Sequence, residues 1–359
     1  MTVTLDTLRD QIDVIDAHIL DLLSRRGAIA QAVGQVKAES GAPVYRPERE
    51  ARVLRGVVER NPGPLHDRDL QTIFREIMSS CRALERRLTV AYPGAAGTLG
   101  RQALFQQFGS AVKSLPCASV GDVFHAVEAG SADYGIAPFE NQAEGVNLRT
   151  LDLLLVTPAV MTGEVWTPVH YGLMSGTGSM EGVSVVCADA QTLRHCQAWL
   201  GLDYPGIEQR AVDSGAEAAM LASWNPGVAA IAGATSAEQY GLRIVRMQVQ
   251  DDPCYLARFV VIGDQASGRS GVDRTSLVLA VPDQADAVQS RLLFQSLLAR
   301  CGVPVTRFET RPARTGPWPY YVYIDIEGHA ADAPVRDALG ALRRHAGFVK
   351  ILGSYPAGL

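Results

Sequence analysis

Residues 4–42 constrain the fold most, because no proline interrupts them and their apolar residues recur at helical spacing. The apolar stripe consists of Leu8, Ile12, Ile15, Ile19 and Leu22. Intervals of four and three residues are typical of a helix with one apolar face. A helix of ~33 residues is ~50 Å long, which is too long for two short following helices to cover. We therefore expect this helix to dimerise and so bury its stripe.

Two shorter helices complete an all-helical first region, residues 1–88. Pro47 with Glu48 suits a first turn, because proline needs no amide partner there and an acidic group favours the positive end of a helix. The run from Asn61 to Pro64 ends this second helix. A third helix is predicted from Asp67 to about Leu88. Its apolar side carries Leu70, Ile73, Phe74, Ile77, Cys81 and Leu84.

The pattern changes after Leu88, where strand and helix signals begin to alternate. Strands are predicted at residues 88–92, 134–138, 182–186, 227–232 and 259–262. Helical stretches lie between them, for example residues 215–224. Such alternation predicts an α/β domain with a largely parallel sheet. We place this domain at residues 89–267, before a Gly- and Ser-rich linker at 265–271.

Residues 272–359 form a third region with its own order of elements. The predicted elements are a strand at 275–281, a helix at 285–301, a strand through Phe308, a strand at 320–326, a helix at 333–345 and a final strand at 350–355. The order βαββαβ predicts a small ferredoxin-like domain.

Charge and cysteine usage exclude several classes of function. A net charge of −5 gives no reason to expect a nucleic-acid partner. No apolar run approaches the roughly 18 residues of a membrane span, and the charged, periodic N-terminus is not a signal peptide. The six scattered cysteines include no Cys-X-X-Cys pair, which favours a reduced, cytoplasmic location without a metal site. The Gly-rich turn at 94–100 lacks the Lys-Ser/Thr ending of a phosphate loop, so no cofactor is expected.

Three cations of the first region suggest a binding site. Arg26 and Lys37 are 11 residues apart, which places them within ~20° on one helix face. Arg9 is turned ~100° away from Arg26 and would serve a different site, such as that of a partner chain. Cations on helices in a water-poor bundle can clamp a small dicarboxylate, and arginine does so in bidentate fashion. By themselves, these charges are typical of a solvated helix face.

The surrounding residues favour the binding site, because they resemble the helical chorismate mutases over nearly all of residues 5–88. The segments that carry this resemblance are 8–16, 22–26, 36–37 and, most densely, 44–50. The resemblance implies an intertwined homodimer that rearranges chorismate to prephenate. It assigns substrate-carboxylate and ether-oxygen contacts to Arg26, Arg49 and Lys37. It also assigns the substrate hydroxyl to Glu50 and a place in the partner's site to Arg9.

Three positions modify this picture. Glu85 stands where the resembled family has Gln or Glu beside the ether oxygen. A glutamate must be protonated to donate a hydrogen bond, so the resemblance implies a pH-dependent activity. Cys81 replaces a serine of some members and Arg46 an aspartate of others, and both affect secondary contacts.

Residues 89–359 resemble prephenate dehydratase, whose fold is like that of periplasmic binding proteins, followed by a regulatory ACT domain. The segments that carry the resemblance are 91–98, 137–145, 213–219, 250–253, 257–259, 309–312 and 352–356. Mutase, dehydratase and ACT in this order is the arrangement of the bifunctional P-protein family of phenylalanine synthesis. The resemblance implies prephenate contacts by Glu140, Asn141, Gln142, Ser214, Arg258 and Phe259.

The second domain departs from this family at its catalytic acid. Dehydration requires an acid that protonates the leaving hydroxyl. In the family this donor is the threonine of a Thr-Arg-Phe motif, which here reads Ala257-Arg258-Phe259. Other positions also differ from the family, namely Leu99, Gly100, Gln142, Gly215, Cys254 and Tyr255. Several polar donors of one pocket are therefore absent.

Three interpretations follow for the second domain. It is a dehydratase with a substitute acid, such as Tyr255 or water. Alternatively, it resembles the prephenate decarboxylases, which remove CO2, keep the ring hydroxyl and release a non-aromatic product. The third possibility is a catalytically inactive binding or regulatory module. The joint loss of several donors favours decarboxylation.

The third domain also departs from the family in its effector motifs. Gln289-Ser290-Arg291 occupies the place of a Gly-Ala-Leu turn that leaves room for phenylalanine, and long side chains would crowd that effector. The second effector motif is retained, including Glu309 and Arg311. We therefore doubt phenylalanine feedback and regard dimerisation as a sufficient role for this domain.

Overall fold

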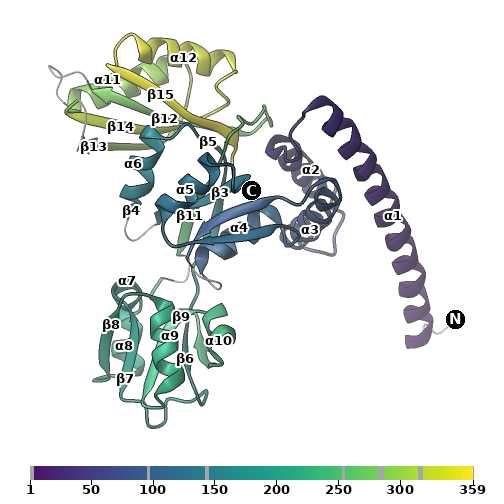
Figure 1. Ribbon diagram of the computed structural model, residues 1–359, viewed down its shortest axis with the longest axis vertical. Helices are drawn as coiled ribbons and strands as arrows, with labels where there is room; N and C mark the ends of the chain where they lie inside the picture. The colour runs from purple at the N-terminus through teal and green to yellow at the C-terminus, as the bar shows by residue number, and fades with distance from the viewer. Residues whose placement is uncertain are drawn as a thin grey trace.

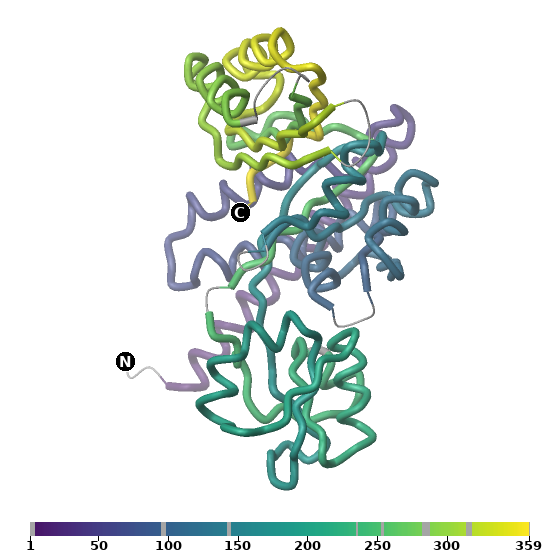
Figure 2. The backbone as a smooth tube through the Cα atoms, turned by 90° about the vertical axis from the view of Figure 1, so that its left-hand side faces the viewer, coloured from purple at the N-terminus to yellow at the C-terminus, as the bar shows by residue number. Residues whose placement is uncertain are grey.

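The structure is a computed structural model, and it describes residues 4–94, 98–141, 145–252, 255–281, 287–313 and 318–358. Three parts follow one another along the chain: three helices, a two-lobed α/β part and a small C-terminal sheet with two helices (Figure 1). The C-terminal part and the second lobe lie at opposite ends of the molecule (Figure 2). Gln142 and Cys254, which the sequence analysis singled out, lie outside the described residues.

The first part consists of α1 (Leu5–Ser40), α2 (Pro47–Glu59) and α3 (Asp67–Glu85). The Thr4 hydroxyl caps α1 by accepting from the Thr7 amide at 3.2 Å, and Gly41 ends the helix with φ +65°. The three predicted helices are confirmed, although α3 ends three residues earlier than expected. No residue of α1 is buried, and α1 projects away from the rest of the chain (Figure 1).

The first lobe is built on a mixed sheet. Its strands in spatial order are β2 (Lys113–Cys117), β1 (Thr89–Pro93), β3 (Tyr134–Asn141), β11 (Leu256–Gly263) and β5 (Val160–Pro168), with β4 (Gly145–Val146) paired to β3. Its helices are α4 (Leu99–Phe108), α5 (Val120–Glu128) and α6 (Leu148–Val156).

The second lobe holds the other sheet of the α/β part. Its strands in spatial order are β10 (Arg243–Met247), β6 (Tyr171–Ser175), β9 (Val228–Gly233), β7 (Val185–Asp189) and β8 (Glu208–Val212). Its helices are α7 (Ala190–His195), α8 (Gln197–Asp203), α9 (Gly215–Trp224) and α10 (Thr235–Tyr240).

The prediction of one largely parallel sheet is wrong, because the α/β part has two mixed sheets. The chain crosses to the second lobe after β5 and returns through β11. On its return, β11 pairs antiparallel with both β3 and β5. Hydrophobic alternation predicts strands and helices but carries no information on the lobe to which a strand belongs.

The C-terminal part has the predicted βαββαβ order. Its elements are β12 (Asp273–Val281), α11 (Ala287–Arg300), β13 (Val305–Pro312), β14 (Tyr320–Glu327), α12 (Ala333–Arg343) and β15 (Phe348–Pro356). The strand order β13-β14-β12-β15 is that of a ferredoxin-like sheet. One face packs on the first lobe, where Tyr323 and Leu352 share an apolar cluster with Phe139 and Met161.

Among the described residues, no helix combines the length and the apolar character that crossing a membrane requires.

Candidate functional site

A pocket of about 490 Å³ lies among the three N-terminal helices. Its charged lining residues are Arg26, Lys37, Arg46, Glu48, Arg49, Glu50, Arg52, Arg82 and Glu85. The remaining lining is mostly apolar, with Ile29, Val33, Val53 and Met78 among its members. Five of the six residues assigned to the mutase by resemblance therefore meet in one place. The excess of cations over carboxylates suits a small anionic ligand.

Arg9 is the sixth assigned residue, and it does not reach this pocket. It lies about five helical turns before Arg26 on α1, or ~26 Å along the helix axis. Its nearest charged partner is Asp6 at 3.6 Å, and both side chains are exposed. This placement agrees with a role in another chain's pocket and leaves that role a prediction.

Lys37 and Glu85 form one side of the pocket. The Lys37 ammonium donates to Glu85 Oε2 at 2.9 Å and to the Val44 carbonyl at 3.0 Å. The close approach of α1 and α3 depends on Gly34, since a Cβ there would lie only 3.1 Å from Glu85 Cβ. In this arrangement Glu85 acts as an acceptor, whereas the resemblance requires it to donate.

Glu50 also lines this pocket, and Arg82 holds its carboxylate. Arg82 Nη1 pairs with Glu50 Oε1, while Arg82 Nη2 donates to the Phe108 carbonyl at 2.6 Å. Burial raises the pKa of Glu50 above its ordinary value, and Arg82 opposes this shift most strongly. Arg82 was not predicted from the sequence. It lies four residues after Met78 and three before Glu85, and this helical spacing, which places it on their side of α3, was an available signal.

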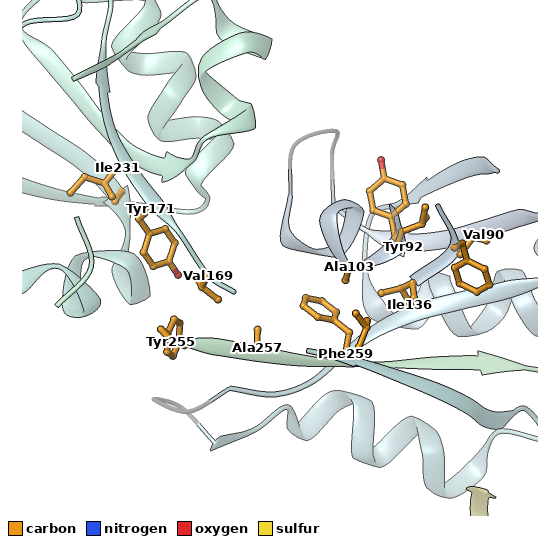
Figure 3. Close-up of a cluster of buried hydrophobic side chains, with 14 of the residues drawn as sticks. Val90, Tyr92, Ala103, Ile136, Val169, Tyr171, Ile231, Tyr255, Ala257 and Phe259 are labelled. Atoms are coloured by element: carbon orange, nitrogen blue, oxygen red, sulfur yellow. The ribbon is translucent and has the colours of Figure 1, made fainter. Parts of the chain in front are cut away.

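A second candidate site lies on one face of β11, between the two lobes. Tyr255, Ala257 and Phe259 follow one another along this face (Figure 3). Ala257 is 8% exposed. Its cross-strand partners are Asn141 on β3 and Thr167 on β5, and directly paired residues share a face of the sheet. The Thr167 hydroxyl donates to Gln106 Oε1 at 3.1 Å.

An aromatic group extends this face toward the second lobe. The His195 ring lies 4.7 Å from the Tyr255 ring and 6.1 Å from the Tyr171 ring, measured between centroids. Burial raises the pKa of Tyr171 above its ordinary value. Together these rings connect the second lobe to the end of β11 near Ala257.

Arg258 and Glu140 do not share that face, contrary to the expectation of one common pocket. Successive side chains of a strand point to opposite sides, so Arg258 points away from Ala257. Its guanidinium is 1% exposed and contacts Glu164 at 2.7 Å, Asp325 at 2.6 Å and Glu140 at 2.9 Å. These partners lie on the first lobe and the C-terminal sheet. Arg258 and Glu140 therefore lie in an ionic junction between domains, and their assignment to prephenate stays a prediction.

Ser214 and Phe259 have structural surroundings of their own. Ser214 Oγ caps α9 by accepting from the Glu217 amide at 3.1 Å, on the second lobe. Phe259 is buried in an apolar cluster to which both lobes contribute. Among the predicted prephenate residues, Asn141 and Phe259 therefore lie near the Ala257 face, while Ser214 belongs to the facing lobe.

The predicted effector region lies on α11 and β13. The guanidinium of Arg291 lies over the Phe308 ring at 5.0 Å, and Ser290 is buried. Glu309 and Arg311 are half-buried on β13, at the edge of the sheet. Arg291 stands at the leucine position of the family's Gly-Ala-Leu turn, while Gln289 and the buried Ser290 stand at its two small residues.

Known proteins resemble the chain over its whole length. It matches chorismate mutase type II at residues 8–86 and prephenate dehydratase at residues 90–267. The bifunctional chorismate mutase/prephenate dehydratase of Neisseria gonorrhoeae is 46% identical over 99% of both chains. The protein with the same description from Pseudomonas aeruginosa is 40% identical, over 98% of this chain and 97% of its own.

A solved structure also resembles the chain. It is the prephenate dehydratase of Arthrobacter aurescens in complex with L-Phe, which is 28% identical with a TM-score of 0.67. The match covers 75% of this chain and 90% of that chain.

Proposed function

Because the chain belongs to the family of bifunctional chorismate mutase/prephenate dehydratases, we propose that it makes prephenate in the helical pocket and decarboxylates it in the two-lobed part. The convergence of Arg26, Lys37 and Arg49 on one pocket supports the first step. The alanine at position 257 carries the second proposal.

The first step needs positioning and charge stabilisation rather than covalent chemistry. Chorismate is a dicarboxylate, so Arg26 and Arg49 bind its carboxylates and hold the compact conformer. Lys37 stabilises negative charge on the ether oxygen as its bond to carbon breaks. Glu50 accepts a hydrogen bond from the substrate hydroxyl, and Glu85 faces the ether oxygen when protonated.

The second step depends on the fate of one electron pair. When the bond from the ring to its carboxylate breaks, CO2 leaves and the bonding pair enters the ring. A dehydratase uses this pair to expel the hydroxyl as water, which requires an acid. Ala257 has no proton to give, so we propose that a proton adds to a ring carbon and the hydroxyl stays. The product is one water heavier than phenylpyruvate.

Dehydration is the second candidate, and the names of the full-length relatives favour it. In this case another group would supply the proton. Tyr255 lies on the same face as Ala257, and its ring lies 4.7 Å from that of His195. A tyrosine hydroxyl at this position is the substitute acid to consider.

We also propose domain limits at residues 1–88, 89–267 and 272–359, with the last as an ACT domain. The βαββαβ order supports this assignment. Because Gln289 and Ser290 replace the family's Gly-Ala, we infer that this domain does not respond to phenylalanine, and we propose that it serves to assemble a homodimer.

Product analysis of the full chain tests the second step. The protein is incubated with chorismate, and the products are identified by mass and ultraviolet spectrum. We expect a product without an aromatic spectrum that is one water heavier than phenylpyruvate. The A257T variant should not form phenylpyruvate, because Tyr255 and Gly215 also differ from the family.

Two other products of this experiment would contradict decarboxylation. Phenylpyruvate from the unmodified protein would overturn decarboxylation, and its loss in Y255F would then identify the substitute acid. Prephenate that accumulates would indicate a binding module. An R49A variant supplied with prephenate provides the control, because it lacks a mutase residue and retains the two-lobed part.

A further inference from the structure

We propose that Arg82 is a positioning residue that orients Glu50 in the mutase pocket, and that the two-lobed part anchors Arg82 through the Phe108 carbonyl. This inference rests on the proposed mutase function. It makes the geometry of the first active site dependent on contact with the second domain.

The contacts of Arg82 connect two domains through one planar group. Arg82 is 5% exposed on α3. One terminal nitrogen pairs with Glu50, and the other donates to the Phe108 carbonyl at 2.6 Å. Phe108 ends α4, where helix carbonyls lack intrahelical partners and the helix dipole is negative. A rigid guanidinium serves two acceptors in a fixed geometry, which a lysine ammonium cannot reproduce.

Aromatic rings restrict the movement of this guanidinium. Its central carbon lies 5.1 Å from the Tyr45 ring centroid and 5.9 Å from that of Phe108. The Tyr45 ring packs in turn against Phe108 at 4.9 Å and Tyr134 at 5.1 Å. Gln107 donates to the Tyr45 hydroxyl at 3.0 Å. The linker before α2, helix α4 and strand β3 thus form one packed junction around Arg82.

The charges around Glu50 explain why Arg82 matters for the reaction. Burial raises the pKa of Glu50, while Arg82, Arg75 and Arg26 lower it. Tyr45 also interacts electrostatically with Glu50. Glu50 lines a small adjoining cavity together with Arg75 and Glu164. Glu48, Arg49 and Arg52 of α2 and Arg46, which precedes this helix, share the mutase pocket with Glu50.

The opposing influences on the Glu50 pKa determine how the loss of Arg82 changes the pH dependence of mutase activity. The ionised form of Glu50 is the stronger acceptor for the hydrogen bond of the substrate hydroxyl. Removal of Arg82 removes the strongest influence that lowers the Glu50 pKa, so this pKa rises further. Mutase activity should then be lost at a higher pH as the solution is acidified.

The experiment compares full-length R82Q and R82K with R86Q. Arg86 pairs with Asp133 at 2.7 Å across the same domain contact, is exposed and does not line the pocket. Chorismate consumption is measured across the acid range as kcat and kcat/KM. We expect R82Q to lower kcat/KM roughly 10- to 100-fold, as for a lost hydrogen bond to a charged group, and to move the acid limb to higher pH. R86Q should leave both unchanged.

R82K separates charge from geometry. It should return the acid limb toward that of the unmodified protein while kcat stays reduced, because the bond to Phe108 is not rebuilt. An unshifted acid limb in R82Q, or an equal shift in R86Q, would overturn the inference. The folding of R82Q is judged by thermal melting and by conversion of added prephenate. If R82Q does not fold, the test rests on R82K, and an unchanged kcat in R82K would contradict the proposal that the Phe108 carbonyl anchors Arg82. Failure of the unmodified protein to consume chorismate would instead refute the mutase proposal itself.

Discussion

At the scale of single residues, the mutase pocket holds two glutamates with opposite requirements. Glu50 accepts a hydrogen bond and is paired with Arg82, whereas Glu85 must donate one and is paired with Lys37. In the structure, Glu85 Oε2 accepts from the Lys37 ammonium at 2.9 Å. Donation to the ether oxygen therefore requires a rearrangement of this hydrogen bond.

The variant E85Q tests this requirement. Glutamine donates a hydrogen bond at every pH, so the variant should keep its chorismate mutase rate in alkaline solution. The unmodified protein should lose about tenfold or more of its rate there, because proton donation by Glu85 ceases. The control is E76Q, since Glu76 lies on the same helix but binds Ser110 instead of lining the pocket. Parallel pH profiles of E85Q and the unmodified protein would contradict a donor role.

The sequence predicted some of these residues and missed others for a physical reason. Arg26 and Lys37 were placed on one face by helical geometry alone, and both line the pocket. Arg82 was missed because one of its partners, the Phe108 carbonyl, belongs to another domain. Helical spacing carries no information on contacts between domains.

At the scale of elements, strand β11 directs neighbouring residues of one sequence motif, Ala257 and Arg258, to opposite sides of the sheet. Ala257 faces the space between the lobes, while Arg258 faces the C-terminal sheet. Strand alternation alone was sufficient to predict that they diverge. The sequence could not reveal that Asp325 and Glu164 approach Arg258 from other elements, since their separation along the chain is long.

The R258M variant tests the junction as a structural element. It leaves Asp325 buried without the cation that pairs with it, whereas Glu164 keeps its contact with Arg274 at 2.6 Å. The loss should lower the stability of the two C-terminal parts by about 3–5 kcal/mol. The measurement is the midpoint of the first urea-induced unfolding transition. R246M is the control, because Arg246 pairs with Asp203 at the exposed surface and its loss should cost about 1 kcal/mol or less.

The R258M variant should also reverse the effect of acid on the free energy of unfolding. Burial alone would raise the pKa of Asp325, but Arg258 and Ser276 hold it below its ordinary value of 3.8. In the unmodified protein, the stability from this group is present above the unfolded pKa and is lost as the pH falls through the folded pKa. Without Arg258 the pKa of Asp325 rises, so R258M should gain stability on mild acidification. Equal acid sensitivity of both proteins would contradict this account.

At the scale of the whole molecule, a single chain leaves the apolar residues of α1 uncovered. Its exposed large apolar residues are Leu5, Leu8, Ile12, Val14, Ile15, Ile19, Leu20, Leu22, Leu23, Ile29, Val33 and Val36. A surface of this kind marks an interaction site. The sequence predicted this helix and its need for a partner from apolar spacing alone. Apolar alternation did not predict the two-lobed arrangement, because lobe membership depends on where the chain crosses between the sheets. Only the resemblance to a fold like that of periplasmic binding proteins implied it.

A mixture of two inactive variants tests whether the partner is a second copy that supplies Arg9. R9A lacks the residue that we assign to the neighbouring pocket, while R26A lacks a residue of its own pocket. Each homodimer should have little mutase activity. In a mixed dimer, the R9A chain offers an intact pocket and the R26A chain offers an intact Arg9, so one of the two sites is complete.

Random exchange of equal amounts should make half of the dimers mixed and restore about a quarter of all sites. The measurement is chorismate consumption after the two proteins are denatured and refolded together, compared with the same proteins refolded separately and then combined on ice. If Arg9 instead acted within its own chain, the mixed dimer would have one site without Arg9 and one without Arg26. Activity would then stay at the level of the separate variants, and the exposed apolar residues of α1 would require another explanation.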